Sequence, residues 1–79
     1  MPVGGFVINV DPDKIDETLI AIKEIDRVEI HGSDEKGNVV AVLESDTSKE
    51  MEEKVEDIMK IDTVFSVGIT YFNAEDEVL

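Results

Sequence analysis

The spacing of hydrophobic residues changes several times along the chain, and each spacing predicts an element. Runs of β-branched residues and two-residue alternation predict strands at residues 6–10, 27–31, 39–43 and 64–72. Apolar residues three and four apart predict helices over residues 14–25 and from Thr47 onwards. Asp13 is a favourable helix N-cap, and Thr47-x-x-Glu50 is a capping-box pattern. The predicted order is strand, helix, strand, strand, helix, strand.

The two halves of this pattern correspond at a constant offset of 36 residues, which aligns Ile15 with Met51, Leu19 with Val55 and Val28 with Val64. A strand–helix–strand crossover is right-handed, and two such units joined by a hairpin give a defined topology. We therefore predict a single α+β domain over residues 1–79 with the ferredoxin-like split βαβ fold. Its four-stranded antiparallel sheet has the order 4-1-3-2, with two helices on one face.

The other face of that sheet has no helix to cover it. Because successive strand side chains point to opposite faces, the polar positions indicate which residues lie there. The following residues are assigned to this face as candidate binding residues: Val7, Asn9, Glu29, His31, Val40, Val42, Glu44, Ser66, Gly68, Thr70 and Phe72. In the last strand, Phe65, Val67, Ile69 and Tyr71 are expected under the helices. An apolar centre of Val7, Val40, Val42 and Phe72, ringed by Glu29, Glu44 and the acidic tail 75–77, is typical of an interface.

The charge restricts the kind of partner. Seven basic residues against twenty acidic ones give a net charge of −13, which opposes binding to nucleic acid and to anionic membrane lipid. No segment approaches the ~20 apolar residues of a membrane span, and the absence of cysteine fits a reducing compartment. We expect a cytoplasmic protein with a neutral or basic partner. Gly4 and Gly5 are interpreted as a flexible leader.

Catalysis and metal binding are not expected. The chain has one histidine, His31, and no cysteine, so no Ser-His-Asp or Cys-His catalytic set can be assembled. His31 also has no second metal ligand of the usual kind near it in the sequence. Asp11, Asp13, Asp16 and Glu17 gather carboxylates without the spacing of a calcium loop, and helix capping explains them. We predict a non-enzyme without a cofactor.

The strands carry a resemblance to a known family. Residues from Phe6 to Glu77 resemble the NapD family, the chaperones of periplasmic nitrate reductase. The likeness lies in apolar strand patterns in a fixed order: Val7-Ile8-Asn9-Val10, Ile15, Val28-Glu29-Ile30, Ser33-Asp34, Gly37-Asn38-Val39-Val40-Ala41-Val42-Leu43-Glu44 and Val64-Phe65-Ser66-Val67-Gly68-Ile69-Thr70-Tyr71.

The resemblance implies a cytoplasmic chaperone that binds the twin-arginine signal peptide of the nitrate reductase catalytic subunit. It would hold the subunit back from export until the molybdenum cofactor is inserted. The alternative is a small-ligand-sensing regulatory domain of the same fold that acts as a dimer. Self-association into a homodimer through the uncovered face would also account for its apolar residues.

Overall fold

The computed structural model describes residues 1–73, and its elements follow the predicted order. In chain order they are β1 (Val3–Val10), the short 3-10 helix η1 (Pro12–Lys14), α1 (Ile15–Lys23), β2 (Val28–Ser33), β3 (Asn38–Glu44), α2 (Ser48–Met59) and β4 (Val64–Asn73). Neither helix of this part of the chain has the length and apolar character required to cross a bilayer.

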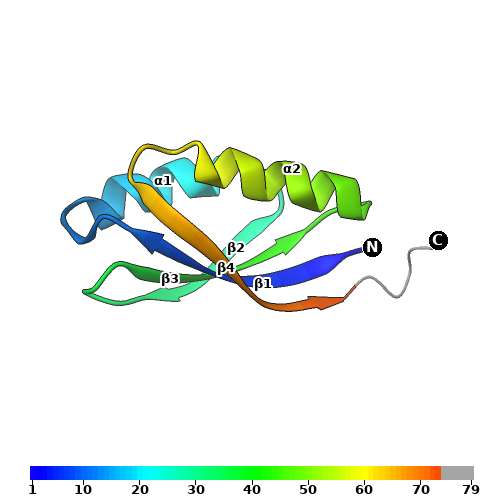
Figure 1. Cartoon of the computed structure of the whole chain (residues 1–79), viewed down its shortest axis with the longest axis horizontal. Helices are drawn as coiled ribbons and strands as arrows, with labels where there is room; N and C mark the ends of the chain where they lie inside the picture. Colours follow the sequence, from blue (N-terminus) through cyan, green and yellow to red (C-terminus); the bar gives the residue numbers. More distant parts are fainter. Residues whose placement is uncertain (74–79) are drawn as a thin grey trace.

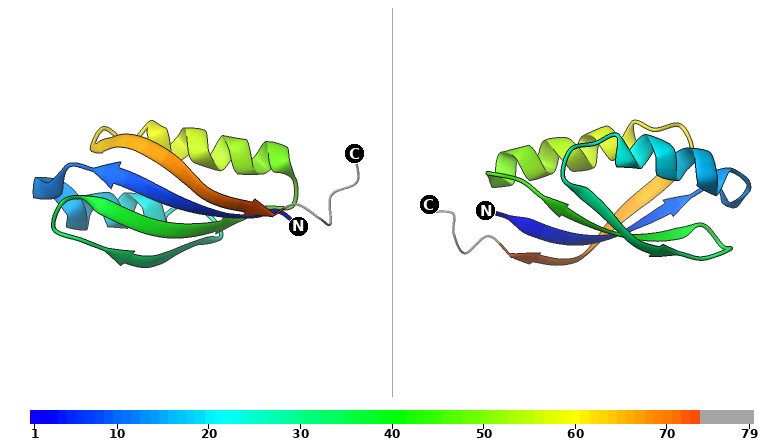
Figure 2. Two further views of the ribbon diagram at one scale, coloured as in Figure 1. Left: turned by 60° about the horizontal axis from the view of Figure 1, so that its bottom comes forward. Right: turned by 180° about the vertical axis from the view of Figure 1, so that it is seen from behind.

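The four strands form one sheet in the order β2-β3-β1-β4, and all neighbouring strands are antiparallel. Both helices lie on the same face of this sheet (Figures 1 and 2). The predicted topology and the ferredoxin-like α+β class are confirmed. We call the sheet face that carries α1 and α2 the covered face, and the opposite one the open face.

The core lies between the covered face and the helices. The central strands β1 and β3 supply most of it, and each helix adds residues from its inner stripe. The buried apolar residues are Phe6, Ile8, Val10, Ile22, Val39, Ala41, Leu43, Met51 and Ile58. A layer of mainly aliphatic side chains therefore holds the sheet to the helices.

Local hydrogen bonds fix where the helices begin. The Thr47 hydroxyl accepts from the Glu50 amide at 3.1 Å, and the Glu50 carboxylate accepts from the Asp46 amide at 3.1 Å. The predicted cap of α2 is therefore present. The predicted cap at Asp13 is wrong, because the Asp11 carboxylate accepts from the Asp13 amide and caps η1 instead.

Two turns adopt left-handed backbone conformations. Gly37, with φ of 91°, closes the hairpin between β2 and β3, where a side chain would collide with the Val10 carbonyl. Arg27, with φ of 59°, adopts this region despite its side chain. Its carbonyl accepts from the Glu44 amide at 3.1 Å, and its guanidinium donates to Asp46 at 3.0 Å. These bonds offset the cost of the unusual conformation.

Irregular pairing in β4 changes which side chains share a face. The pairing passes from Phe6 with Ile69 directly to Gly5 with Tyr71, so Thr70 is an extra residue in β4. Beyond this bulge the alternation reverses. The expectation that Tyr71 packs under the helices and Phe72 lies on the open face is wrong: Tyr71 opposes Gly5 on the open face, and Phe72 opposes Gly4 on the covered face. The same expectation for Phe65 is also wrong, because the pairing with β1 skips this residue and its side chain is 67% exposed.

Candidate functional site

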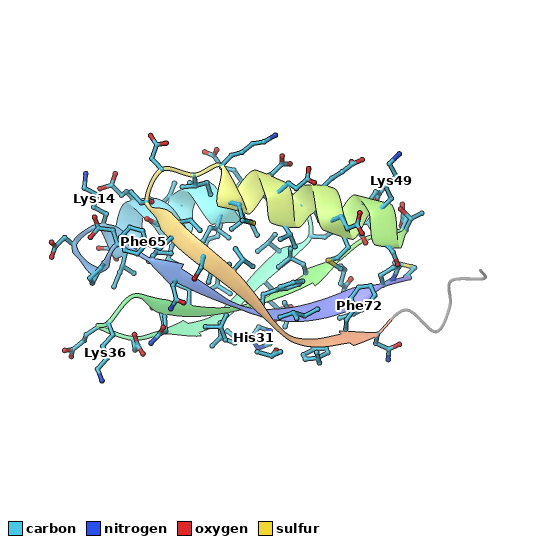
Figure 3. The ribbon with its side chains drawn as sticks, viewed as in Figure 1. Lys14, His31, Lys36, Lys49, Phe65 and Phe72 are labelled. Carbon is cyan, nitrogen blue, oxygen red and sulfur yellow. The ribbon has the colours of Figure 1, made fainter. Side chains whose placement is uncertain are left out.

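The open face is formed by all four strands, and register places its side chains in rows across the sheet. Ten of the eleven residues predicted for this face lie on it, and Phe72 does not. The ten are Val7, Asn9, Glu29, His31, Val40, Val42, Glu44, Ser66, Gly68 and Thr70. His31 is skipped in the pairing of β2 with β3, and its contact with Glu29 places it on this face. In Figure 3, helices lie above the sheet and His31 lies on its lower side.

The middle row of the open face is apolar and shallow. Val7 and Val40 are paired across β1 and β3, and Gly68 and Gly32 continue the row on the two edge strands. Val40 is 44% exposed. A Cβ atom added at Gly32 would meet nothing within 4 Å, and one at Gly68 would meet only the Val7 carbonyl at 3.8 Å. Val7 and Val40 therefore project from the centre of this row, and the glycines at its two ends have no side chain.

At one end of the open face, polar side chains are linked by a series of hydrogen bonds. The Ser66 hydroxyl donates to Asn9 at 3.0 Å, the Asn9 amide donates to Asn38, and the Asn38 amide donates to Asp34 at 2.9 Å. The side-chain hydrogen bond from Asn38 is the main cause that lowers the pKa of Asp34. Asn9 and Ser66 are therefore already hydrogen-bonded within the protein, so they frame the apolar rows.

The other end of the open face is acidic. Glu29 and Glu44 flank Val42 in a hollow of 260 Å³, whose remaining walls are Arg27 and Val28. Arg27 is turned to Asp46, and their hydrogen bond is the main cause that raises the pKa of Arg27 and lowers that of Asp46. Glu29 lies 3.3 Å from His31, a charged pair only when the imidazole is protonated. The expected contribution of residues 75–77 to this rim lies outside the described residues.

Tyr71 is an open-face residue that alternation missed, and so is Val3, which is paired with Glu44. The Tyr71 ring lies against Gly5, where an added Cβ atom would be 2.2 Å from the ring. Gly4 and Gly5 are therefore part of a paired strand, and the interpretation of them as a flexible leader is wrong. A glycine facing an aromatic residue on a neighbouring strand is the sequence signal that could have located this ring.

Two further hollows lie outside the open face. A groove of 420 Å³ on the covered side is lined by β4 and α2, including Ile69, Phe72, Met51 and Val55. In Figure 3, Phe72 lies on this side of β4. The Phe72 side chain therefore lines this groove, because the alternation of β4 reverses at the bulge.

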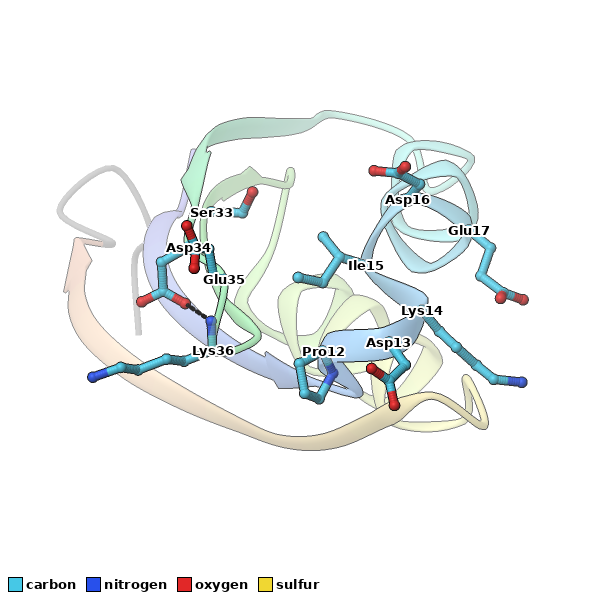
Figure 4. A pocket seen from close by; sticks show the side chains of 10 residues that line it. All are labelled: Pro12, Asp13, Lys14, Ile15, Asp16, Glu17, Ser33, Asp34, Glu35 and Lys36. Carbon is cyan, nitrogen blue, oxygen red and sulfur yellow. Dashed lines mark hydrogen bonds between the residues drawn. The ribbon is translucent and has the colours of Figure 1, made fainter.

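The second hollow, of 980 Å³, lies between η1, the start of α1 and the hairpin turn at Asp34 (Figure 4). The Asp34 carboxylate in it accepts from the Lys36 amide at 2.9 Å. Within residues 1–73, no three His, Cys, Asp or Glu side chains are grouped to hold a metal ion. The carboxylates of this second hollow stabilise the hairpin turn and the start of the helix.

Comparison with known proteins agrees with this architecture. The chain is 30% identical over 76 residues to the Chaperone NapD of Haemophilus influenzae, an alignment that covers 95% of this chain and 82% of that protein. The solution structure of the E. coli Tat proofreading chaperone protein NapD superposes with a TM-score of 0.83 at 19% identity, covering 98% of this chain and 82% of that one. At that identity the structural match establishes the fold. The family model for the NapD protein matches residues 1–76, and the chain therefore belongs to the NapD family.

Proposed function

We propose that the open face binds the twin-arginine signal peptide of a periplasmic nitrate reductase catalytic subunit. By holding this peptide in the cytoplasm, the protein would delay export until the molybdenum cofactor is inserted in its client. It would act by binding alone, without catalysis. Membership of the NapD family supports a chaperone role, and the E. coli structure with this fold is described as a Tat proofreading chaperone.

One observation carries the proposal: the strand positions of the open face combine half-buried and exposed aliphatic side chains with carboxylates. None of these described positions is a lysine or arginine, and Arg27 at the acidic end is paired with Asp46. A twin-arginine leader is the complement, since it has basic residues followed by a moderately apolar stretch. As an amphipathic helix it would place its apolar side on Val7, Val40 and Val42. Its basic residues would then approach Glu29 and Glu44, which would set orientation and speed encounter.

The test is a titration of the full chain with a synthetic leader peptide, followed by calorimetry and by backbone amide chemical shifts. We expect shift changes confined to β1, β3 and the flanking strand segments, and an affinity that falls modestly as salt rises. Val42→Asp should weaken binding more than tenfold, because it introduces a charge into the apolar contact; tenfold corresponds to about 1.4 kcal/mol.

The matched control is Ile20→Asp. Ile20 is an exposed aliphatic residue on α1, so this variant adds the same charge away from the open face. Affinity for the peptide should stay within about twofold of the unchanged protein. Absence of heat and of shift changes with the unchanged protein, or equal losses in both variants, would refute the proposal. Sedimentation of the same samples tests whether a homodimer forms.

A further inference from the structure

The strongest unassigned feature of the open face is the seat of the Tyr71 ring. The bulge at Thr70 turns this side chain to the open face, and Gly5 provides the space beneath it. An added Cβ atom at Gly5 would lie 2.2 and 2.5 Å from two ring carbons, so no other residue fits there unless the ring moves. The ring therefore lies over the β1 backbone at Gly5.

The remaining surface of the ring is available to a ligand. Tyr71 is 50% exposed although it lies on the sheet. The ring sits above β1, and Val42 of β3 is the direct pairing partner of Gly5. An aromatic ring held over a strand backbone, half exposed and with an aliphatic neighbour, is a preformed site on which a planar group can stack.

Carboxylates stand beside this site. Glu44 follows Val42 by two residues on the same face, so its Cα atom is about 8 Å from that of Gly5 by strand geometry. Glu29 is the pairing partner of Val42 on the far side. No lysine or arginine of residues 1–73 lies within ion-pair distance of Glu44, and Arg27 is engaged by Asp46. The negative charge beside the ring is left for a ligand.

We propose that Tyr71 and Glu44 form a subsite that selects an arginine side chain of the bound peptide over lysine. The proposal rests on the proposed function and adds which residue type the open face reads. A guanidinium is planar and can stack on the ring while its edge donates to the carboxylate. An ammonium group makes the ion pair and is attracted to the ring face but cannot stack on it, so the stacking supplies the discrimination.

The sequence provides a direct probe of this subsite. Tyr71 is the only tyrosine of the chain, which has no tryptophan. Its emission therefore reports on the ring alone, provided that the peptide has neither residue. The full chain is titrated with a synthetic twin-arginine leader peptide free of Tyr and Trp, and with the same peptide carrying lysine at both positions. Calorimetry gives the affinities in parallel.

We expect the arginine peptide to bind about two- to fivefold more tightly than the lysine peptide, the range for an exposed cation–π contact. It should also protect the tyrosine emission from acrylamide quenching. Tyr71→Leu should reduce the affinity ratio to about one, and Tyr71→Phe, which keeps the ring, should retain it. Glu44→Gln should weaken both peptides and leave the arginine peptide the tighter of the two.

Phe65→Leu is the matched control, since Phe65 is an aromatic residue of β4 that is 67% exposed and away from the Gly5 seat. The ratio should survive this substitution. Binding of both peptides with equal affinity, or a ratio that persists in Tyr71→Leu, would overturn the arginine subsite and leave the proposed function standing. Failure of the unchanged protein to bind either peptide would overturn both.

Discussion

On β3, neighbouring aliphatic side chains lie in different environments on the two faces of the sheet. Val39, Ala41 and Leu43 are fully buried between the sheet and the helices, whereas Val40 on the open face is 44% exposed. Burial of the first set from water drives folding. Val40 and the other aliphatic residues of the open face gain less free energy from burial, because they stay partly in contact with water. Their presence on the open face is explained by a ligand or by the strand preference of β-branched residues, and these two causes can be separated.

The largest expected effect comes from replacing Leu43 and Val42 separately by alanine. Leu43→Ala removes a fully buried side chain and should lower the free energy of unfolding by about 2–5 kcal/mol. Val42→Ala should lower it by less than about 1 kcal/mol, because the side chain is only partly covered. Denaturant unfolding followed by circular dichroism measures both. Similar losses in the two variants would mean that the open face contributes to folding as the covered face does.

A second test compares two glycines whose side-chain positions both face the open side. Gly5→Ala places a methyl group where the Tyr71 ring lies and should cost about 1–3 kcal/mol of stability, with a change in tyrosine emission. Gly32→Ala meets open space and should be nearly neutral. If Gly5→Ala leaves both stability and emission unchanged, the ring is not seated on Gly5.

The contribution of strand preference is isolated by threonine. Val40→Thr with Val42→Thr keeps β-branching and shape but replaces a methyl group by a hydroxyl at each position. We expect the free energy of unfolding to change by less than about 1 kcal/mol. The affinity for the leader peptide should fall about fivefold, because apolar contact is lost. Calorimetric titration of the double variant against the unchanged protein provides the measurement. Unaltered affinity would assign these valines to strand formation alone.

The smallest effect is expected at the polar end of the open face. Hydrogen bonds from Asn38 hold the pKa of Asp34 below 3.8, so the folded state favours the ionised carboxylate. The resulting stabilisation is present above pH 3.8 and is lost as pH falls through the lower folded-state pKa. Asp34→Asn should therefore be less stable than the unchanged protein near neutral pH, with the difference shrinking as the pH falls below 3.8 and the folded-state carboxylate becomes protonated. Unfolding curves at several pH values measure it, and a difference that grows on acidification would contradict the assignment.

Regular alternation was sufficient to predict most of this architecture from the sequence. In β3, Val40, Val42 and Glu44 share the predicted face because the pairing with β1 has no irregularity. In β4, Tyr71 and Phe72 exchange faces because Thr70 is an extra residue, and no change in hydrophobic pattern marks a bulge. Gly4 and Gly5 carry no side chain that would extend the strand pattern of residues 6–10, although Gly5 here provides room for a ring.

The irregular pairing of β4 also affects how readily a strand of another molecule could pair with this edge of the sheet. β4 is an outer strand of ten residues, and its sequence from Val64 to Asn73 contains no charged side chain. A long neutral outer strand is a template for strands of other molecules, and natural proteins interrupt such templates with local kinks. The pairing of β4 with β1 skips both Phe65 and Thr70, and these two bulges break the ladder into short pieces. Deleting Thr70 would join the longer pieces, and the shortened chain should aggregate on concentration.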